Sequence, residues 1–324
     1  MSEIIISIII PIYNASGYVS KCIDHIINQP VDSSAYEIIC VDDCSIDNSR
    51  DIIMRYSSKY SNVKLISHKE NKKQGAARNT GLMSAVGKYI WYIDADDYIT
   101  DNFLYHLTDK EISVDNVDIY QFNSISINID GSTFNEEYLV DKITMSGLDY
   151  LLYESRINYK NRIKATWSKW YRREFLVKNN LLFKEGVYWE DVVHTLKCFY
   201  LAEKIVYKPL YGYMYVQTPN SDMRGKQNGM KYADSIRFCV DCLEFLKSMN
   251  APKELLSFYY PYYEKTFVKC KKNLNRLSLK EFIIFSKSVA NMNTFIITDY
   301  HSSKESNWLK YKYLHFFVWI NLLK

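Results

Sequence analysis

The stretch IIISIIIPIY, residues 4–13, is the starting point for predicting the architecture of this 324-residue chain. A continuous apolar run of this length is typical of a strand that is buried on both faces, as in a parallel sheet covered by helices. Glu3 precedes the run where a signal peptide would be basic, and Pro11 interrupts it. We therefore predict a buried first strand here, and not a targeting segment or a membrane span.

The rest of the first hundred residues alternates between the strand period and the helix period. Short runs of β-branched, aromatic and aliphatic residues predict strands at 37–41, 63–67 and 88–93. Apolar residues at helical spacing predict helices at 19–27, 52–56 and 76–86. Gly87 is expected to end the last of these helices. This alternation predicts right-handed crossovers and a mostly parallel sheet in an α/β fold.

The second half of the chain is less regular. Alternating or aromatic segments at 116–129 and 204–216 predict further strands, and helices are expected to begin near Arg172 and at Glu190. From about residue 217 the sequence becomes helical and polar. We therefore expect the sheet in residues 1–216 and a C-terminal helical region in residues 217–324.

Composition excludes several classes of protein. A formal net charge of +4 is too small to indicate a nucleic-acid partner. Seven cysteines, an odd number spread over a long chain, do not suggest a disulfide framework, and a reducing, cytoplasmic location is expected. Cys239 and Cys242 have redox or zinc spacing but no second pair or nearby His, so we predict a buried helical pair.

Three polar clusters follow expected strands, at residues 11–14, 41–47 and 94–97. In parallel sheets the carboxyl ends of the strands share one edge, where ligands bind, so these clusters are expected to converge. The last cluster, DADD, places Asp94, Asp96 and Asp97 within four positions. Carboxylates this close are stabilised by a divalent cation, for which Mg²⁺ or Mn²⁺ suits the oxygen ligands. The alternative is one helix cap and two solvated acids.

Asp42 and Asp43 are candidates for contact with a nucleobase or ribose, and helix capping is the alternative for this segment. Arg78 and the helix N-terminus near Gly75 are candidate partners for a phosphate or a base. The spacing of a P-loop is not met around Gly87, and no GxGxxG motif follows the first strand. A dinucleotide cofactor is therefore not expected.

Five segments, SIIIPIYN, VDDCSIDNS, GAARNTGL, GKYIWYIDADD and WED, resemble in order and spacing the bacterial family 2 glycosyltransferases. The likeness extends over roughly residues 4–215. It implies a GT-A, Rossmann-like fold that binds a nucleotide-sugar, with residues 1–216 as the catalytic domain. Two departures from the family pattern are Cys44, where relatives usually carry Gly, and Trp170, where an aliphatic residue is more common.

The resemblance also implies roles for individual residues. The nucleotide would be lined by Pro11, Tyr13, Asp42, Asp43, Arg78 and Asp94. DADD would be the metal motif, with Asp96 the direct ligand and Asp97 beside it. Asp191 in WED would be the catalytic base, with Glu190 as the second candidate; helix capping is the alternative for Asp191. His194, one turn further on, is interpreted as a packed helical residue.

The activity implied is inverting transfer of a hexose or N-acetylhexosamine in capsule, exopolysaccharide or lipopolysaccharide assembly. A UDP-sugar is the expected donor, and a glycan or a lipid-linked saccharide the acceptor. One alternative is an aspartyl-phosphate phosphatase of the haloacid-dehalogenase type, because DADDY follows a strand. That motif requires Thr or Val at Tyr98 and a place on the first strand. The other alternative is a non-catalytic sugar-binding protein on the same fold.

The C-terminal region, residues 217–324, allows two interpretations. Six aromatic residues lie between Trp308 and Trp319, and the segment 269–280 holds five cations and no acid. These features are consistent with peripheral association of residues 269–324 with an anionic membrane surface. A packed terminal helix and a solvated helix face explain them equally well.

Overall fold

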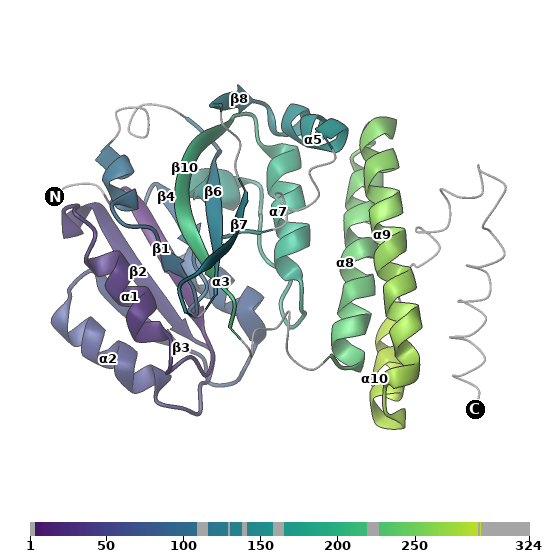
Figure 1. Ribbon diagram of the computed structural model, residues 1–324, viewed down its shortest axis with the longest axis horizontal. Helices are drawn as coiled ribbons and strands as arrows, with labels where there is room; N and C mark the ends of the chain where they lie inside the picture. The colour runs from purple at the N-terminus through teal and green to yellow at the C-terminus, as the bar shows by residue number, and fades with distance from the viewer. Residues whose placement is uncertain are drawn as a thin grey trace. The chain divides into compact units, whose positions relative to one another are not determined.

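The computed structural model describes residues 4–108, 116–128, 130–137, 141–157, 165–218, 227–290 and 292 (Figure 1). They belong to two compact units. One consists of Met1–Leu151 and Asn161–Arg224, and the other of Leu152–Lys160 and Gly225–Lys324. The aromatic segment from Trp308 to Trp319, for which a membrane role was considered, lies outside the described residues.

Four parallel strands form the first half of the sheet, in the order β3-β2-β1-β4. They are β1 (Ile6–Ile12), β2 (Tyr36–Asp42), β3 (Val63–Ser67) and β4 (Tyr89–Tyr92). Every residue of β1 is buried, with Ile8 paired to Ile38 on one side and to Trp91 on the other. The continuous apolar run therefore forms a central strand covered on both faces, as predicted.

The second half of the sheet is mixed, and continues β9-β6-β10-β5 from β4. These strands are β9 (Lys169–Arg172), β6 (Ile119–Ile127), β10 (Ile205–Val216) and β5 (Tyr98–Ile99). β9 lies antiparallel between β4 and β6, and β6 pairs in parallel with β10. Two further strands pair antiparallel, β7 (Thr133–Glu137) with β6 and β8 (Ile143–Met145) with β10. The predicted α/β fold is confirmed, and the sheet is mixed where a mostly parallel one was predicted.

Helices cover both faces of the parallel strands. On one face α1 (Val19–Ile27) and α2 (Ser49–Lys59) bury their apolar stripes in the cluster that holds Ile8 and Ile10. α3 (Lys73–Ser84) packs on the opposite face, where a Cβ on Gly81 would lie 2.3 Å from Ile9 Cγ2. Glycine at position 81 therefore permits close contact between the helix and the strand.

Gly87 does not end helix α3, contrary to the prediction. The helix ends at Ser84, and Ala85 in extended conformation is its C-cap residue. A Cβ on Gly87 would lie 2.6 Å from the backbone nitrogen of Ser7. The glycine is needed because the chain passes close to β1 on its way into β4, and not because of a left-handed backbone.

Of the remaining helices, those that begin at Arg173 and Glu190 start where the sequence predicts. In the first unit the remaining helices are η1 (Ser33–Ala35), η2 (Phe103–Thr108), α6 (Arg173–Lys178) and α7 (Glu190–Leu201), and α5 (Gly147–Ile157) begins there. The second unit contains α8 (Gly229–Ser248), α9 (Lys253–Asn273), η3 (Leu274–Arg276) and α10 (Leu279–Val289). Cys239 and Cys242 are buried and unoxidised in α8, as predicted. None of the described helices combines the length and the apolar character that crossing a membrane requires.

Candidate active site

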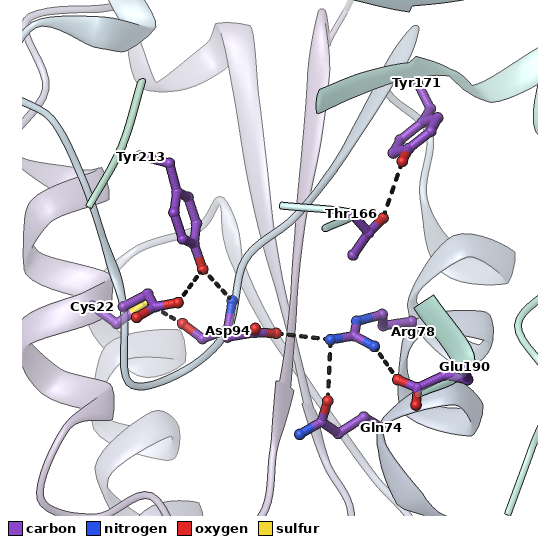
Figure 2. A network of polar contacts seen from close by, with 9 residues as sticks. Cys22, Gln74, Arg78, Asp94, Thr166, Tyr171, Glu190 and Tyr213 are labelled. Carbon is purple, nitrogen blue, oxygen red and sulfur yellow. Dashed lines mark hydrogen bonds and ion pairs between the residues drawn. The ribbon is translucent and has the colours of Figure 1, made fainter. Parts of the chain in front are cut away.

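The acidic turn follows β4 at the carboxyl end of the parallel strands. Ile93 still donates its N–H to Ile9, and Asp97 N–H then closes a turn on the carbonyl of Asp94 at 3.1 Å. The Asp94 backbone is held from both sides: its N–H donates to the hydroxyl of Tyr213 at 3.2 Å, and its carbonyl lies 3.7 Å from the Cys22 thiol (Figure 2). The turn is therefore fixed by α1 and β10 together.

Arg78 connects this turn to the start of α7. Its side chain is only 3% exposed and donates one amino group to Asp94 Oδ1 at 2.8 Å and the other to Glu190 (Figure 2). A third contact runs to Gln74 Oε1, one helical turn earlier, at 3.2 Å. A buried guanidinium is stable here because carboxylates on two sides compensate its charge, and their charges raise its pKa.

Helix α7 starts at Glu190, directly after Trp189, which has a left-handed backbone with φ of 64°. Asp191 lies in the first helical turn. Burial raises the pKa of Asp191 to about 7; the negative charge of Glu190 adds to the increase, and Arg78 opposes it. The pKa of Glu190 is raised as well, chiefly by burial. A carboxylate with a pKa near neutrality is suited to accept a proton during a reaction.

The three acids of the turn differ in their surroundings. Asp97 is 1% exposed and accepts hydrogen bonds from the Tyr213 hydroxyl at 2.6 Å and from Val216 N–H at 2.7 Å. Its pKa is raised well above the usual range by burial and by the other two carboxylates. Asp96 is partly exposed and accepts from the Thr218 hydroxyl at 2.8 Å. Asp94 is also partly exposed, at 27% of its side chain.

Within the described part of the chain, no group of three or more His, Cys, Asp or Glu side chains has the geometry of a metal site. Asp94 and Asp96 nevertheless supply hard oxygen atoms that are partly open to solvent. One or two carboxylates are sufficient for Mg²⁺ or Mn²⁺ when substrate phosphates and waters complete the coordination. The donor set therefore fits a metal that binds together with a phosphorylated substrate, and Asp97 is the acid least suited to be its ligand.

The ends of β1 and β2 carry the residues expected to line a nucleotide. Pro11 is buried within β1, and Tyr13, immediately after the strand, is 49% exposed. Asp42 is buried and accepts from Ser45 N–H at 3.1 Å, which is a turn-forming contact. The exposed ring of Tyr13 is the part of this group that faces solvent.

Asp43 links the end of β2 to the start of α3. Its side chain is 2% exposed and accepts from Lys72 N–H, with 2.9 Å to Oδ1 and 3.1 Å to Oδ2. Asp43 Oδ1 also lies 2.6 Å from His68 Nδ1, and the other ring nitrogen of His68 contacts the Thr80 hydroxyl at 2.9 Å. In this structure the carboxylate of Asp43 therefore organises the loop around it.

The family is decided by a match of the sequence profile described as Glycosyl transferase family 2 to residues 7–178. The chain belongs to this family. The family predicted from the sequence and the predicted glycosyltransferase class are thereby confirmed. The phosphatase alternative has no support, since the acidic turn follows β4 and not the first strand.

Individual relatives agree with this assignment. The poly(ribitol-phosphate) beta-glucosyltransferase of Bacillus spizizenii is 33% identical over 216 residues, which is 65% of this chain but only 32% of that protein. The chain thus spans about a third of that relative's length. The structure of S. aureus TarS 1-349 in complex with UDP-GlcNAc superposes with a TM-score of 0.65 at 21% identity, covering 89% of this chain and 80% of that 1-349 chain.

A more distant structural match is the mannosyltransferase PcManGT from Pyrobaculum calidifontis, in complex with GDP-Man and Mn²⁺. Its TM-score is 0.53 at 16% identity, and the match covers 90% of this chain and 81% of that one. At these identities the two structural matches establish the GT-A-like fold of this family 2 member. They also show that proteins of this fold bind nucleotide-sugars and that one of them holds a divalent metal.

Sequence reasoning missed several residues of the site. Tyr213, Val216 and Thr218 hold Asp97 and Asp96, yet they lie 116 to 122 residues away along the chain. From the sequence, Glu190 is only the second candidate base, whereas the structure shows it as the partner of Arg78. His68 has no local signal at all. The only sequence signal for Glu190 is the pair of adjacent acids at the start of a helix.

Proposed function

We propose that this family 2 glycosyltransferase moves a hexose or N-acetylhexosamine from a UDP-sugar to a hydroxyl of a cell-surface glycan, with inversion at the anomeric carbon. The observation that carries the proposal is the position of Arg78. One buried guanidinium contacts both Asp94 of the acidic turn and Glu190, the neighbour of Asp191. A diphosphate-binding turn and a candidate base are thereby held at one edge of the sheet, as a direct displacement requires.

On the donor side, the nucleotide would lie across the ends of β1 and β2. The exposed ring of Tyr13 offers a face for a base, and Pro11 supports the strand beneath it. Asp42 and Asp43 would hold the shape of the loop beside the nucleotide rather than contact it through free carboxylates. Their oxygens already accept hydrogen bonds from Ser45 and Lys72. A UDP-sugar is chosen because TarS, which shares the fold, binds UDP-GlcNAc.

Asp94 and Asp96 would hold Mg²⁺ or Mn²⁺. When bound, such an ion offsets the negative charge that the leaving diphosphate gains. Thr218 orients Asp96 by donating its hydroxyl to Oδ2, and Tyr213 orients Asp94 by accepting its backbone N–H. We place Asp97 outside the metal shell, because both of its oxygens accept hydrogen bonds from buried groups of β10.

Asp191 would remove the proton from the attacking acceptor hydroxyl. With a pKa of about 7, about half of the Asp191 carboxyl groups are ionised at neutral pH, and the carboxylate is basic enough to accept that proton. No protein nucleophile is needed for a direct displacement, and the anomeric configuration then inverts. Arg78 and Glu190 would act as positioning residues, since they fix the start of α7 relative to the acidic turn.

The acceptor would be a glycan or a lipid-linked saccharide of the cell envelope. The relative from Bacillus spizizenii, whose name specifies poly(ribitol-phosphate), supports an envelope polymer as the class of acceptor, although that polymer is a polyol phosphate and not a saccharide. Capsule, exopolysaccharide and lipopolysaccharide assembly are the processes in which such an acceptor arises.

Peripheral contact with an anionic membrane is a separate part of the proposal. The cations Lys269, Lys272, Arg276 and Lys280 are exposed on the second unit. The chain should sediment with phosphatidylglycerol vesicles and not with phosphatidylcholine vesicles, and a variant with these four cations changed to Ala should remain in solution. Equal sedimentation of both proteins would refute this part.

The central test is a thermal-shift panel of UDP-, GDP-, CMP- and dTDP-sugars, each with and without Mn²⁺. We expect stabilisation by a UDP-sugar that increases with Mn²⁺, since a ligand that binds only the folded state raises the melting temperature. Release of UDP in the presence of acceptor glycans then measures turnover. Stabilisation by none of the four nucleotide classes would contradict the donor assignment.

A further inference from the structure

Three aromatic side chains form a stack beside the acidic turn. The ring of Trp167 lies nearly parallel to that of Tyr213, with centroids 4.4 Å apart and an interplanar angle of 11°. It is also nearly parallel to Tyr215, at 5.9 Å and 9°. The two tyrosines alternate on β10 and so project to the same side. Trp167 itself precedes β9, and its carbonyl accepts the indole N–H of Trp91 at 2.5 Å.

The stack is attached directly to the catalytic edge. The hydroxyl of Tyr213 donates to Asp97 and accepts from the backbone of Asp94, and Figure 2 shows it placed on the acidic turn. Tyr213 is fully buried, so its ring is a fixed support. Trp167 and Tyr215 are partly exposed. An aromatic surface is therefore held one tyrosine ring away from the carboxylates proposed to bind the donor diphosphate.

The strand order places this surface away from the nucleotide. In the sheet, β2 and β1 lie on one side of β4, whereas β9, β6 and β10 lie on the other side. Tyr13 and Asp43 follow β1 and β2, so the proposed nucleotide site is on the first side of the acidic turn. The stack of Trp167, Tyr213 and Tyr215 lies on the opposite side, where the second substrate of a direct displacement would enter.

The chemistry of Trp167 suits a sugar ring. Among the described residues no hydrogen bond is formed by its indole N–H, although the side chain is partly exposed. The face of an aromatic ring carries negative charge density and attracts the weakly positive C–H groups on one face of a pyranose. The indole N–H can donate to a hydroxyl at the edge of that ring. A polyol phosphate chain has no flat C–H face, so its contact with the Trp167 ring would be less favourable.

We propose that Trp167, supported by Tyr213 and flanked by Tyr215, binds a pyranose ring of the acceptor saccharide. Trp167 is thus a specificity-determining residue on the acceptor side of the acidic turn. The inference rests on the proposed transfer from a nucleotide-sugar, and it adds the acceptor subsite and the class of ligand that fills it.

Kinetics separate this role from a structural one. In Trp167→Ala the KM for a pyranoside acceptor should rise about 10-fold, as loss of one aromatic contact predicts. The KM for the UDP-sugar and the slow hydrolysis of the donor by water should stay within about 2-fold of the wild-type values, because water needs no aromatic platform. Trp167→Phe keeps a stacking ring and should recover most of the acceptor affinity.

Two further variants make the comparison sharp. Tyr13→Ala should raise the KM for the donor and leave the KM for the acceptor unchanged, the reverse of Trp167→Ala. Tyr105→Ala removes a tyrosine that is 58% exposed in η2 and should change neither constant. If Trp167→Ala and Trp167→Phe both leave the acceptor KM at the wild-type value, the inference is wrong. If the wild-type chain neither transfers nor hydrolyses any UDP-sugar, the proposed function fails instead.

A binding measurement avoids dependence on turnover. The chain has six tryptophans, so a ¹⁵N-indole spectrum is simple, and the peak missing in Trp167→Phe identifies Trp167. Methyl β-glucopyranoside and a chitobiose glycoside are the pyranose probes, ribitol 5-phosphate is the polyol probe, and UMP is the nucleotide probe. We expect the Trp167 peak to shift with a pyranose probe. A shift with ribitol 5-phosphate or UMP alone, or with none of the probes, would overturn the assignment.

Discussion

Arg78 donates to Asp94 across 2.8 Å, joining helix α3 to the turn after β4 although the residues are 16 positions apart in the sequence. The same guanidinium contacts Glu190, which lies 112 positions after Arg78 in the sequence. Three segments of the chain therefore meet at one buried positive charge. Because Asp94, Glu190 and Asp191 all act on the pKa of this group, the charge balance of the candidate site depends on it.

Replacing Arg78 by Met should strongly destabilise the first unit. The change leaves Asp94 and Glu190 without their buried counter-charge, and removing one partner of such a pair costs about 3–5 kcal/mol. Urea denaturation measures the loss. Arg156→Met is the matched control, since Arg156 pairs with Glu254 where the side chains are 67% and 47% exposed. Exposed pairs contribute about 0–1 kcal/mol. Equal losses in the two variants would contradict the role of Arg78.

Turnover should depend on pH through Asp191. Its pKa of about 7 means that the carboxylate becomes protonated as the pH falls through neutrality, and a protonated carboxyl cannot accept the acceptor's proton. We expect kcat to fall below about pH 7. Asp191→Asn should lower kcat by at least ~10²-fold while leaving nucleotide binding nearly intact.

The control for this prediction is Asp149→Asn, because Asp149 also occupies the first turn of a helix, α5. It accepts the Ser146 hydroxyl at 2.6 Å in an exposed cap, and its replacement should leave kcat and its pH profile unchanged. A wild-type pH profile in Asp191→Asn would remove Asp191 as the base.

Two neighbouring acids, Asp96 and Asp97, should respond in opposite ways to replacement by Ala. Asp96→Ala should abolish the Mn²⁺-dependent part of nucleotide-sugar binding with a smaller loss of folding stability, about 1 kcal/mol, because this side chain is partly exposed and only the Thr218 hydroxyl donates to it. Asp97→Ala should lower the free energy of unfolding by about 2–4 kcal/mol, since two buried donors lose their acceptor.

Calorimetric titration with Mn²⁺ in the presence of UDP, together with urea denaturation, measures both effects. Asp101→Ala, at an exposed position close by, should leave both quantities at wild-type values. Full activity in EDTA would count against the metal. Loss of Mn²⁺ binding in Asp97→Ala, with the free energy of unfolding unchanged, would mean that Asp97 is a metal ligand.

Acid should destabilise the chain through His194. This ring is 1% exposed, stacks on Phe183 at 3.8 Å, and faces the charges of Arg78 and Lys197. Burial and the Arg78 charge lower its pKa to about 3. An unfolded His titrates near 6.5, so below that pH the unfolded chain binds a proton that the folded chain does not. The contribution of neutral His194 is therefore complete above about pH 6.5 and is lost as the pH falls toward 3.

The expected loss from this group is on the order of 2–3 kcal/mol at pH 4.5, measured as the decrease in the free energy of unfolding from pH 7. His194→Phe keeps an aromatic ring against Phe183 without a titratable group. It should show a correspondingly shallower pH dependence. The same slope in both proteins would mean that His194 is not the group responsible.

Local pattern was sufficient for much of the fold. The apolar run of β1, the strands β2 to β4 and the helical stripe of α1 lie where the periodicity placed them. Glu190 begins α7 as expected, and His194 is packed as expected. The role of Gly87 was predicted wrongly. A glycine is required there because Ser7, in a strand eighty residues earlier, lies too close for a side chain.

Hydrophobic period and motif spacing are properties of short segments, so the sequence alone predicts the parallel strands, the order of the motifs and the family. The surroundings of each acid depend instead on how the chain folds. Asp96 and Asp97 are adjacent in the chain, yet pairing with β10 leaves one partly exposed and buries the other. The physical reason is that burial and hydrogen bonding set the chemistry of a carboxylate, and both depend on residues more than one hundred positions away.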